Sequence, residues 1–329
     1  MTGGIDGLAP EVREYVDAMA AVFPDVGGTV MDPVEARRIH DAAVMAFGRG
    51  KVGSVTDRMI PGPVGAPELR VRIYHPPARG GPCPTVVFFH GGGWVLGGLE
   101  SHDRLCRQIC RDASAVVVAV AYRLAPEARF PAPVEDAYAA VRWAAGHVDE
   151  LGGATGALVV AGDSSGGTLA TCAALLARER GGPSLALQVL IHPATDAALD
   201  TASHRRNAYG YYLTAAHLRW FRDQYLGPDG DVRHPLASPL RADLAGLPPT
   251  HLVTAGCDPV CDEGRAYAAK LAAAGVRVTE AHYPRMFHGF LALGGAVGEA
   301  RHALAGVAEA IAGSCLDRKP SGDHGGCAG

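Results

Sequence analysis

Apolar and polar positions follow a repeating pattern from residue 69 onward. Short apolar runs rich in β-branched residues alternate with longer segments that have helical patterns. The predicted strands are 69–74, 85–90, 115–121, 157–162, 186–191, 250–255 and 276–283. Most of these runs are continuously apolar, which is typical of strands buried on both faces of a mostly parallel sheet.

The segments between these strands predict helices over 101–112, 133–147, 165–180, 262–274 and 298–312. Ser165 or Asp262 at a helix start and Gly275 just after a helix end are the expected boundary signals. We interpret Asp262 and Glu263 as capping residues of the helix that begins there. The alternation predicts the α/β class, with a doubly wound, mostly parallel sheet.

Two stretches interrupt the alternation. Residues 1–50 look helical, and residues 195–235 hold a cluster of aromatic side chains: Tyr209, Tyr211, Tyr212, Trp220, Phe221 and Tyr225. We expect both stretches to pack together as a helical cap over the carboxyl edge of the sheet, where open α/β sheets bind ligands. An ordinary peripheral helix pair is the alternative interpretation.

This pattern divides the chain into parts. The predicted parts are an N-terminal piece of the cap (1–50), a cap insertion (195–235), a sheet domain (51–194 and 236–314) and a disordered tail (315–329). The tail is assigned on its lack of periodicity.

Composition narrows the class of protein. Hydrophobic residues make up 48% of the 329 residues and charged residues 19%, which supplies a large core and excludes a disordered polyelectrolyte. The formal net charge is −4, and the chain has no basic block. Because nucleic-acid binding replaces phosphate counterions with basic side chains, this balance excludes a bulk electrostatic nucleic-acid binder.

The apolar runs and the cysteines indicate the compartment in which the protein is expected to work. The first 25 residues have no basic region followed by an unbroken apolar stretch, so no secretory signal is expected. No apolar run approaches the roughly 18 residues that a membrane helix needs, so we expect a cytoplasmic protein with no membrane partner. The eight cysteines include no CxxC pair. We interpret Cys106/Cys110 and Cys257/Cys261 as buried reduced thiols rather than zinc ligands.

The sharpest chemical motif is GDSSGG at 162–167, directly after an apolar run and before a predicted helix. This is GxSxG in the strand–turn–helix context of a nucleophile elbow, with Ser164 as the exposed nucleophile. Gly162 and Gly166 stand where the turn is too tight for side chains. The helix that begins at Ser165 points its N–H groups and positive dipole end at a developing oxyanion.

A second motif, HGGGW at 90–94, closes the predicted strand 85–90. Consecutive glycines let the N–H groups of Gly91 and Gly92, with Gly93 as a further candidate, approach a tetrahedral oxyanion without interference from a Cβ atom. A flexible turn is the alternative interpretation. A dinucleotide loop fails on spacing, because Leu96 stands where GxGxxG needs its last glycine.

Two candidate partners of Ser164 follow in the chain. Asp258 comes after the predicted strand 250–255, and His288 comes after 276–283. The order Ser164, Asp258, His288 is that of an α/β-hydrolase triad, with each member beyond the carboxyl end of a strand. The serine needs a neutral imidazole to take its proton, and the imidazole needs a carboxylate to fix its tautomer.

Five segments together resemble the hormone-sensitive-lipase-like group of α/β-hydrolases, which includes bacterial family IV carboxylesterases. They are HGGGW (90–94), YRLAPE (122–127), GDSSGG (162–167), CDPVCDEG (257–264) and MFHGF (286–290). The resemblance implies the α/β-hydrolase fold, with a cap formed by the N-terminal region and an insertion after the sixth strand. It also implies that the sheet domain is catalytic.

The same resemblance implies roles for single residues. Ser164 would be the nucleophile, Asp258 the acid and His288 the base, with the oxyanion hole formed by N–H groups of Gly91, Gly92 and Ser165. YRLAPE would hold the HGGG loop through Arg123 and Glu127, with a surface ion pair as the alternative. No cofactor or metal is implied, and relatives pair through the edge strand near the C-terminus, so a homodimer is a further expectation.

These observations predict a serine carboxylesterase that hydrolyses short- to medium-chain esters through an acyl-enzyme, with a small-molecule ester as substrate. Two alternatives stay open. One is a dedicated tailoring hydrolase of secondary metabolism, such as a deacetylase, lactonase or dehydratase. The other is a ligand receptor on the same fold, although such receptors lack a full triad.

Overall fold

One eight-stranded sheet runs through the middle of the protein. The computed structural model describes residues 7–44, 50–77, 81 and 83–315. The strands are β1 (Ser54–Ile60), β2 (Leu69–His75), β3 (Cys83–Phe89), β4 (Val116–Ala121), β5 (Gly153–Asp163), β6 (Leu187–Ile191), β7 (Thr250–Cys257) and β8 (Val278–Phe287). Their order in the sheet is β1-β2-β4-β3-β5-β6-β7-β8. The predicted strands 69–74 to 276–283 are all present, and the α/β class is confirmed.

The direction of the strands places the site. β3 to β8 are parallel, while β1 pairs antiparallel with β2, and β2 antiparallel with β4. The carboxyl ends of the six parallel strands therefore meet at one edge of the sheet, and the chain turns that follow β3, β5, β6, β7 and β8 lie there together. β1 escaped prediction because its sequence SVTDRMI is mostly polar and exposed, as befits an edge strand.

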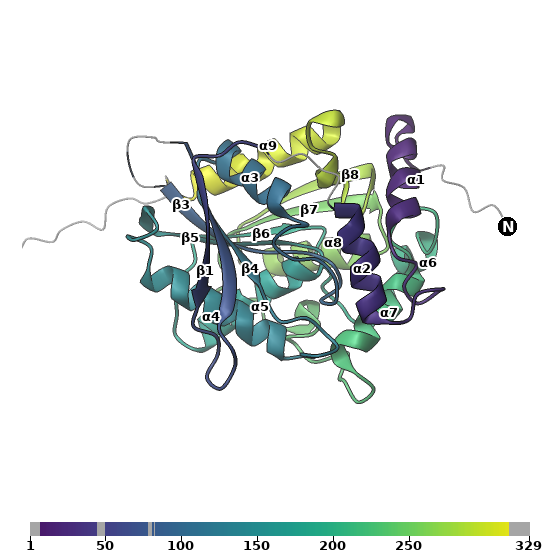
Figure 1. The fold of residues 1–329 in the computed structure, drawn as a ribbon, viewed down its shortest axis with the longest axis horizontal. Coiled ribbons are helices and arrows are strands. Elements are labelled where there is room, and N and C mark those ends of the chain that lie inside the picture. The colour runs from purple at the N-terminus through teal and green to yellow at the C-terminus, as the bar shows by residue number, and fades with distance from the viewer. Residues whose placement is uncertain (1–6, 45–49, 78–80, 82, 316–329) are drawn as a thin grey trace, which may run out of the picture.

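Helices cover both faces of the sheet. The longer ones are α1 (Arg13–Val22), α2 (Pro33–Val44), α3 (Asp103–Asp112), α4 (Ala132–Gly146), α5 (Ser165–Glu179), α7 (Ala215–Leu226), α8 (Cys261–Ala273) and α9 (Gly298–Gly313). A five-residue helix, α6 (Ala202–Arg206), and short 3₁₀ helices at Pro10–Val12, Pro239–Arg241 and Phe290–Ala296 complete them. Figure 1 shows α3 and α9 on one side of the sheet and α4 and α5 on the other.

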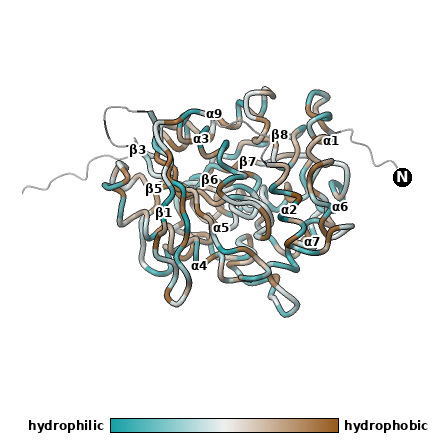
Figure 2. Tube along the Cα trace, in the orientation of Figure 1, coloured by the Kyte–Doolittle hydropathy of each residue, from teal (hydrophilic) through white to brown (hydrophobic). Residues whose placement is uncertain are grey.

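The alternation of side chains along each strand builds two cores. On β3, Val87 and Phe89 face the α4–α5 side, and Val86 and Phe88 face the α3–α9 side. This two-sided burial is why the central strands are apolar throughout. Figure 2 shows the hydrophobic residues gathered along the middle of the sheet, with polar residues at the outer turns.

The N-terminal helices and α7 lie together at the carboxyl edge of the sheet, on the right of Figure 1. The Trp220 Nε1–H donates to the carbonyl oxygen of Met31 at 3.3 Å, and the rings of Phe23 and Tyr212 meet edge to face at 5.0 Å. The two stretches that interrupt the strand–helix rhythm are therefore in direct contact. In the described ranges, no helix is both long enough and apolar enough to cross a membrane.

Candidate active site

The turn after β5 places Ser164 at the edge of the sheet. Its backbone has a φ of 55°, which is uncommon for a residue other than glycine and is typical of a strained functional turn. A Cβ at Gly162 would collide with the backbone of Gly166, and one at Gly166 would collide with the carbonyl of Phe89. The glycines of the motif are thus required by close backbone approach, as the sequence predicted.

Ser164, His288 and Asp258 form a continuous chain of hydrogen bonds. The Nε2 atom of His288 lies 2.9 Å from the Ser164 Oγ, and its Nδ1 atom lies 2.7 Å from the Asp258 Oδ2. Asp258 is fully buried, and its Oδ1 accepts the N–H of Val260 at 2.9 Å. The structure therefore brings together the three residues that the sequence singled out, from turns after three different strands.

The N–H groups of the HGGG loop divide between two uses. The Gly91 N–H donates to the Asp163 Oδ1 at 3.0 Å, so it is occupied within the fold. Within the described chain, the N–H groups of Gly92, Gly93 and Ser165 have no such partner. The assignment of Gly91 as an oxyanion donor stays a prediction, and in this structure its N–H is bonded to Asp163 whereas those of Gly92 and Ser165 are not.

Two buried histidines lie at this edge of the sheet, His192 beside the predicted triad and His90 at the start of the HGGG loop. The ring of His192, in the turn after β6, packs against His288 with centroids 4.3 Å apart. Burial, and to a lesser degree His288, lower the pKa of His192 to about 4. Burial also lowers the pKa of His90 to about 3. Both rings are therefore neutral at pH 7, which leaves His288 without a cationic neighbour from this pair.

The YRLAPE segment supports the loop differently from the expectation. Arg123 pairs with Asp136 of α4, with an Nη2–Oδ1 distance of 2.6 Å, and not with Glu127. Glu127 pairs with Arg37 of α2, whose guanidinium also donates to the carbonyl oxygens of Val95 and Ala125. The predicted role is therefore wrong for Arg123, which bonds to α4, whereas Glu127 supports the loop indirectly by holding Arg37.

Asp262 and Glu263 also differ from their predicted role as helix caps. The N-terminus of α8 has no side-chain cap. Instead, Asp262 accepts the N–H of Ser203, and the buried Glu263 accepts the N–H groups of Thr195 and Asp196. These two carboxylates therefore connect the segment that follows β6 to the first turn of α8, because they accept backbone N–H groups of that segment.

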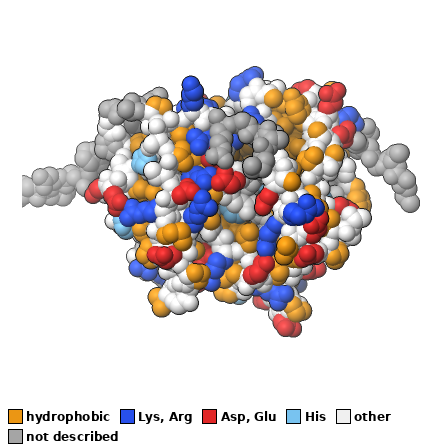
Figure 3. Space-filling model, in the orientation of Figure 1, with side chains coloured by type: hydrophobic (Ala, Val, Ile, Leu, Met, Phe, Trp, Pro, Cys, Tyr) orange, Lys and Arg blue, Asp and Glu red, His pale blue; other side chains and the backbone are white. Residues whose placement is uncertain are grey.

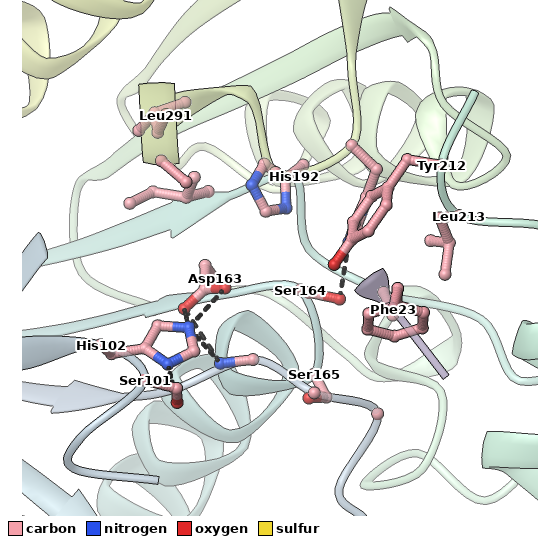
Figure 4. Close-up of a pocket in the computed structure, with 18 of the residues that line it drawn as sticks. Phe23, Ser101, His102, Asp163, Ser164, Ser165, His192, Tyr212, Leu213 and Leu291 are labelled. Carbon is pink, nitrogen blue, oxygen red and sulfur yellow. Dashed lines mark hydrogen bonds and ion pairs between the residues drawn. The ribbon is translucent and has the colours of Figure 1, made fainter. Parts of the chain in front are cut away.

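A cavity of about 840 Å³ opens at Ser164. Its walls are mostly apolar and come from α1, α3, α7 and the Phe290–Ala296 helix, with Met19, Phe23, Leu105, Leu213, Phe221 and Leu291 among them. Figure 4 shows Phe23, Tyr212 and Leu213 on one side of Ser164, with the Tyr212 side chain pointing toward it. An apolar cavity with a few convergent polar groups is typical of a small-molecule site.

The remaining candidate groups do not form a second site. Burial raises the pKa of Cys106, Cys110, Cys257 and Cys261, so these thiols are protonated at neutral pH. In the part of the chain that is described, no cluster of three His, Cys, Asp or Glu side chains is arranged to hold a metal ion. On the face in Figure 3, acidic and basic side chains are intermixed rather than gathered in a patch of one sign.

Sequence reasoning missed four residues that the structure places around the centre: Arg37, His102, Asp163 and His192. Asp163 was part of the nucleophile motif but carried no assigned role. Arg37 and His102 had no signal at all, because each bonds to a partner far away in the sequence: Arg37 to Val95, and His102 to Asp163.

Comparison with known proteins agrees with this geometry. A family model described as the alpha/beta hydrolase fold matches residues 86–292. The carboxylic ester hydrolase LipN of Mycobacterium tuberculosis is 43% identical over 300 residues, which cover 88% of this chain and 79% of LipN. The ethyl acetate hydrolase of Pseudomonas putida is 42% identical over 249 residues, covering 74% and 78% of the two chains.

Solved structures give the same result. The hyperthermophilic esterase of the archaeon Pyrobaculum calidifontis superposes with a TM-score of 0.87 at 39% identity, covering 94% of this chain and 99% of that one. The chain therefore belongs to the α/β-hydrolase fold family, and the predicted resemblance to its hormone-sensitive-lipase-like group is confirmed. The predicted enzyme class, a carboxylic ester hydrolase, agrees with the names of these relatives, which do not favour the receptor or tailoring alternatives.

Proposed function

We propose that Ser164, His288 and Asp258 carry out ester hydrolysis through an acyl-enzyme. The observation that carries this proposal is the unbroken chain of hydrogen bonds from the Ser164 hydroxyl through His288 to the buried Asp258. A neutral serine is a poor nucleophile at pH 7, and such a chain is what activates it.

The reaction proceeds in two halves. His288 takes the proton of Ser164 as its oxygen attacks the ester carbonyl, and Asp258 stabilises the imidazolium that forms. The tetrahedral intermediate expels the alkoxide, which takes the proton from His288. Water then attacks the acyl-enzyme, again giving a proton to His288, which returns it to Ser164 as the acid leaves.

The oxyanion is held by the N–H groups of Gly92, Gly93 and Ser165 in this proposal. Gly92 and Gly93 have φ values of 115° and 61°, which turn the loop over the end of β5, and Ser165 begins α5. Each donor of this kind contributes about 3 kcal/mol to the stability of the transition state.

The substrates are small neutral esters with short to medium acyl chains. The cavity volume of about 840 Å³ lies within the range of small-molecule sites, and its walls are mostly apolar. α1, α2 and the segment 195–235 form the cap that closes this cavity over the sheet domain. β8 is the last strand of the sheet, and a homodimer would form by pairing of two β8 strands.

A panel of p-nitrophenyl esters from C2 to C10 tests the activity and its chain-length range. We expect turnover by the wild-type chain to peak at the shorter acyl groups and to fall by at least about 10⁴-fold in Ser164→Ala. Wild-type rates no better than those of Ser164→Ala across the panel would contradict the proposal. Thr168→Ser, a conservative change on the same helix and not at the site, serves as the matched control.

A further inference from the structure

Asp163 precedes the nucleophile and turns its side chain toward the HGGG loop rather than toward His288. Its side chain is 14% exposed. The Oδ1 atom accepts the N–H of Gly91 at 3.0 Å, and the Oδ2 atom lies 3.2 Å from the Nε2 atom of His102. Figure 4 shows Asp163 and His102 in contact to the left of Ser164. The Asp163 carboxylate therefore links the nucleophile elbow to Gly91, the first glycine of the HGGG loop.

His102 extends this connection to the far end of the same loop. Its Nδ1 atom lies 2.8 Å from the Ser101 Oγ, which accepts the N–H of Gly98 at 2.9 Å. The network thus holds the loop at Gly91 and at Gly98. Gly92 and Gly93 lie between these two fixed points.

The close approach at Gly91 has a steric signature. A Cβ at this position would collide with the Asp163 carboxylate. The first glycine of HGGG is therefore needed to let its N–H reach Asp163, whereas Gly92 and Gly93 are needed for the turn itself. The first glycine of the motif and the two that follow it are therefore needed for different physical reasons.

Three histidines lie around the Asp163 carboxylate: His90, His102 and His192. Burial alone would raise the pKa of Asp163, but the charge of His102 and its hydrogen bond outweigh burial and lower the pKa to about 2. His90 and His192, which also face Asp163, are neutral at pH 7. Of these three histidines, His102 is the one within hydrogen-bond distance of the carboxylate, so it is the side chain that fixes the carboxylate in place.

We propose that Asp163 and His102 are positioning residues that hold the loop from Gly91 to Gly98 so that the N–H groups of Gly92 and Gly93 face the oxyanion. This inference rests on the proposed ester hydrolysis. Neither residue touches the reacting atoms; both act through the loop. Their loss therefore weakens binding of the transition state more than binding of the ground-state ester.

The test compares kcat, KM and the inhibition constant of an alkyl trifluoromethyl ketone, whose adduct with serine places an oxyanion in the hole. For Asp163→Ala we expect kcat to fall about 10²-fold and the inhibition constant to rise by a similar factor, with KM within about threefold of wild type. Asp163→Asn keeps an oxygen that accepts the Gly91 N–H, so it should recover most of the loss. His102→Ala should fall between the two.

Asp136→Asn is the matched control, because Asp136 is fully buried and paired with an arginine outside the cavity. It should lower the melting temperature as Asp163→Ala does, yet leave kcat and inhibition unchanged. The proposal is overturned if Asp163→Ala keeps its kcat, if kcat and KM change while inhibition does not, or if Asp136→Asn loses as much kcat.

Ser164→Ala in the same assay separates this inference from the function on which it rests. If the wild-type activity does not depend on Ser164, the proposed function fails. If it does depend on Ser164 while Asp163→Ala behaves as wild type, only the positioning role fails. Should Asp163→Ala not fold, Asp163→Asn and His102→Ala carry the same comparison, with equal inhibition constants in both variants and wild type as the contradicting result.

Discussion

The reaction centre and the helices that cover it are built on different principles. The centre is made of backbone: Ser164 at a φ of 55°, and Gly92 and Gly93 at positive φ. The covering helices are held by side chains that reach between distant segments, such as Arg37 to Glu127 and Trp220 to Met31. A centre made of backbone geometry is specified by short motifs, whereas a cover made of side-chain contacts depends on partners far apart in the chain.

The two regions meet at the oxyanion loop. The ring of Phe221, on α7, packs directly over Gly93, where a Cβ would collide with it. Next to it, Trp94 and Tyr225 stack with ring centroids 4.2 Å apart and planes 5° apart. The loop that is proposed to hold the oxyanion thus also forms the floor on which α7 rests.

A substitution at this junction is expected to have the largest effect. In Gly93→Ala, the methyl group meets Phe221 and the φ of 61° becomes strained, so the loop shifts and kcat falls about 10²-fold. Adding Phe221→Ala should remove the collision but not the strain, and so restore only part of the rate. Gly146→Ala, where a Cβ meets open space, is the control for kcat measured on a short ester. Full recovery in the double variant would show that packing alone sets the loop.

Acid should act on the centre through its buried histidines. The folded-state pKa values of His90 and His192, about 3 and about 4, lie below the ordinary 6.5. Between pH 6.5 and pH 4 these two histidines are protonated in the unfolded chain but neutral in the folded chain. The free energy of unfolding therefore decreases as the pH falls from 6.5 toward 4. Each histidine should cost about 2 kcal/mol between pH 7 and pH 5.

Urea unfolding at the two pH values measures this loss. His192→Gln should reduce the difference between pH 7 and pH 5 by about 2 kcal/mol. His302→Gln, at an exposed position on α9, should leave the difference unchanged. An unchanged difference in His192→Gln would mean that this ring does not titrate as described.

The contact between α2 and the loop gives the next effect. Arg37→Met removes the donor to the Val95 and Ala125 carbonyls and the ion pair with Glu127, so we expect about 2 kcal/mol less stability and a few-fold lower kcat. Arg38→Met, which breaks only an exposed pair with Glu35, should leave the stability nearly unchanged. Equal melting temperatures of the two variants would show that the contacts of Arg37 do not stabilise the loop.

The smallest expected effect comes from a substitution in α1, one of the helices over the cavity. Met19 of α1 lines the cavity, so Met19→Trp should shorten it and lower kcat/KM for C8 and C10 esters about tenfold relative to C2. Val34→Trp, on the exposed side of α2, should leave the chain-length profile unchanged. The profile of p-nitrophenyl esters decides between them. A uniform loss across all chain lengths would show that α1 does not limit the acyl chain.

The sequence predicted the sheet well because burial on both faces leaves a continuous apolar run that is readable without a partner. The runs at 85–90, 115–121 and 250–255 match β3, β4 and β7 within two residues at each end. β1 was missed because an exposed antiparallel edge strand has neither continuous apolarity nor a clear alternation. The division into cap and sheet domain stays a prediction, and the tail lies almost wholly outside the described residues.

The same contrast holds at the site. Ser164, Asp258 and His288 were found in the sequence because each follows a strand and the topology of a parallel sheet gathers such positions at one edge. The wrong expectations, for Arg123, Asp262 and Glu263, all concern which partner a side chain bonds to, and the role of Gly91 stays a prediction. The Gly91 N–H bonds to Asp163, and Arg123 pairs with Asp136. Asp262 and Glu263 of α8 accept N–H groups of the segment after β6.

The sequence by itself determined the strands, the elbow and the order of the proposed triad residues, because local backbone demands and periodicity are set by neighbouring positions. Only the tertiary structure decided which N–H groups of the HGGG loop stay free, that Arg37 supports this loop, and which side chains line the cavity. These depend on hydrogen bonds and packing between segments tens to more than a hundred residues apart, such as Arg37 with Ala125 and Phe221 with Gly93.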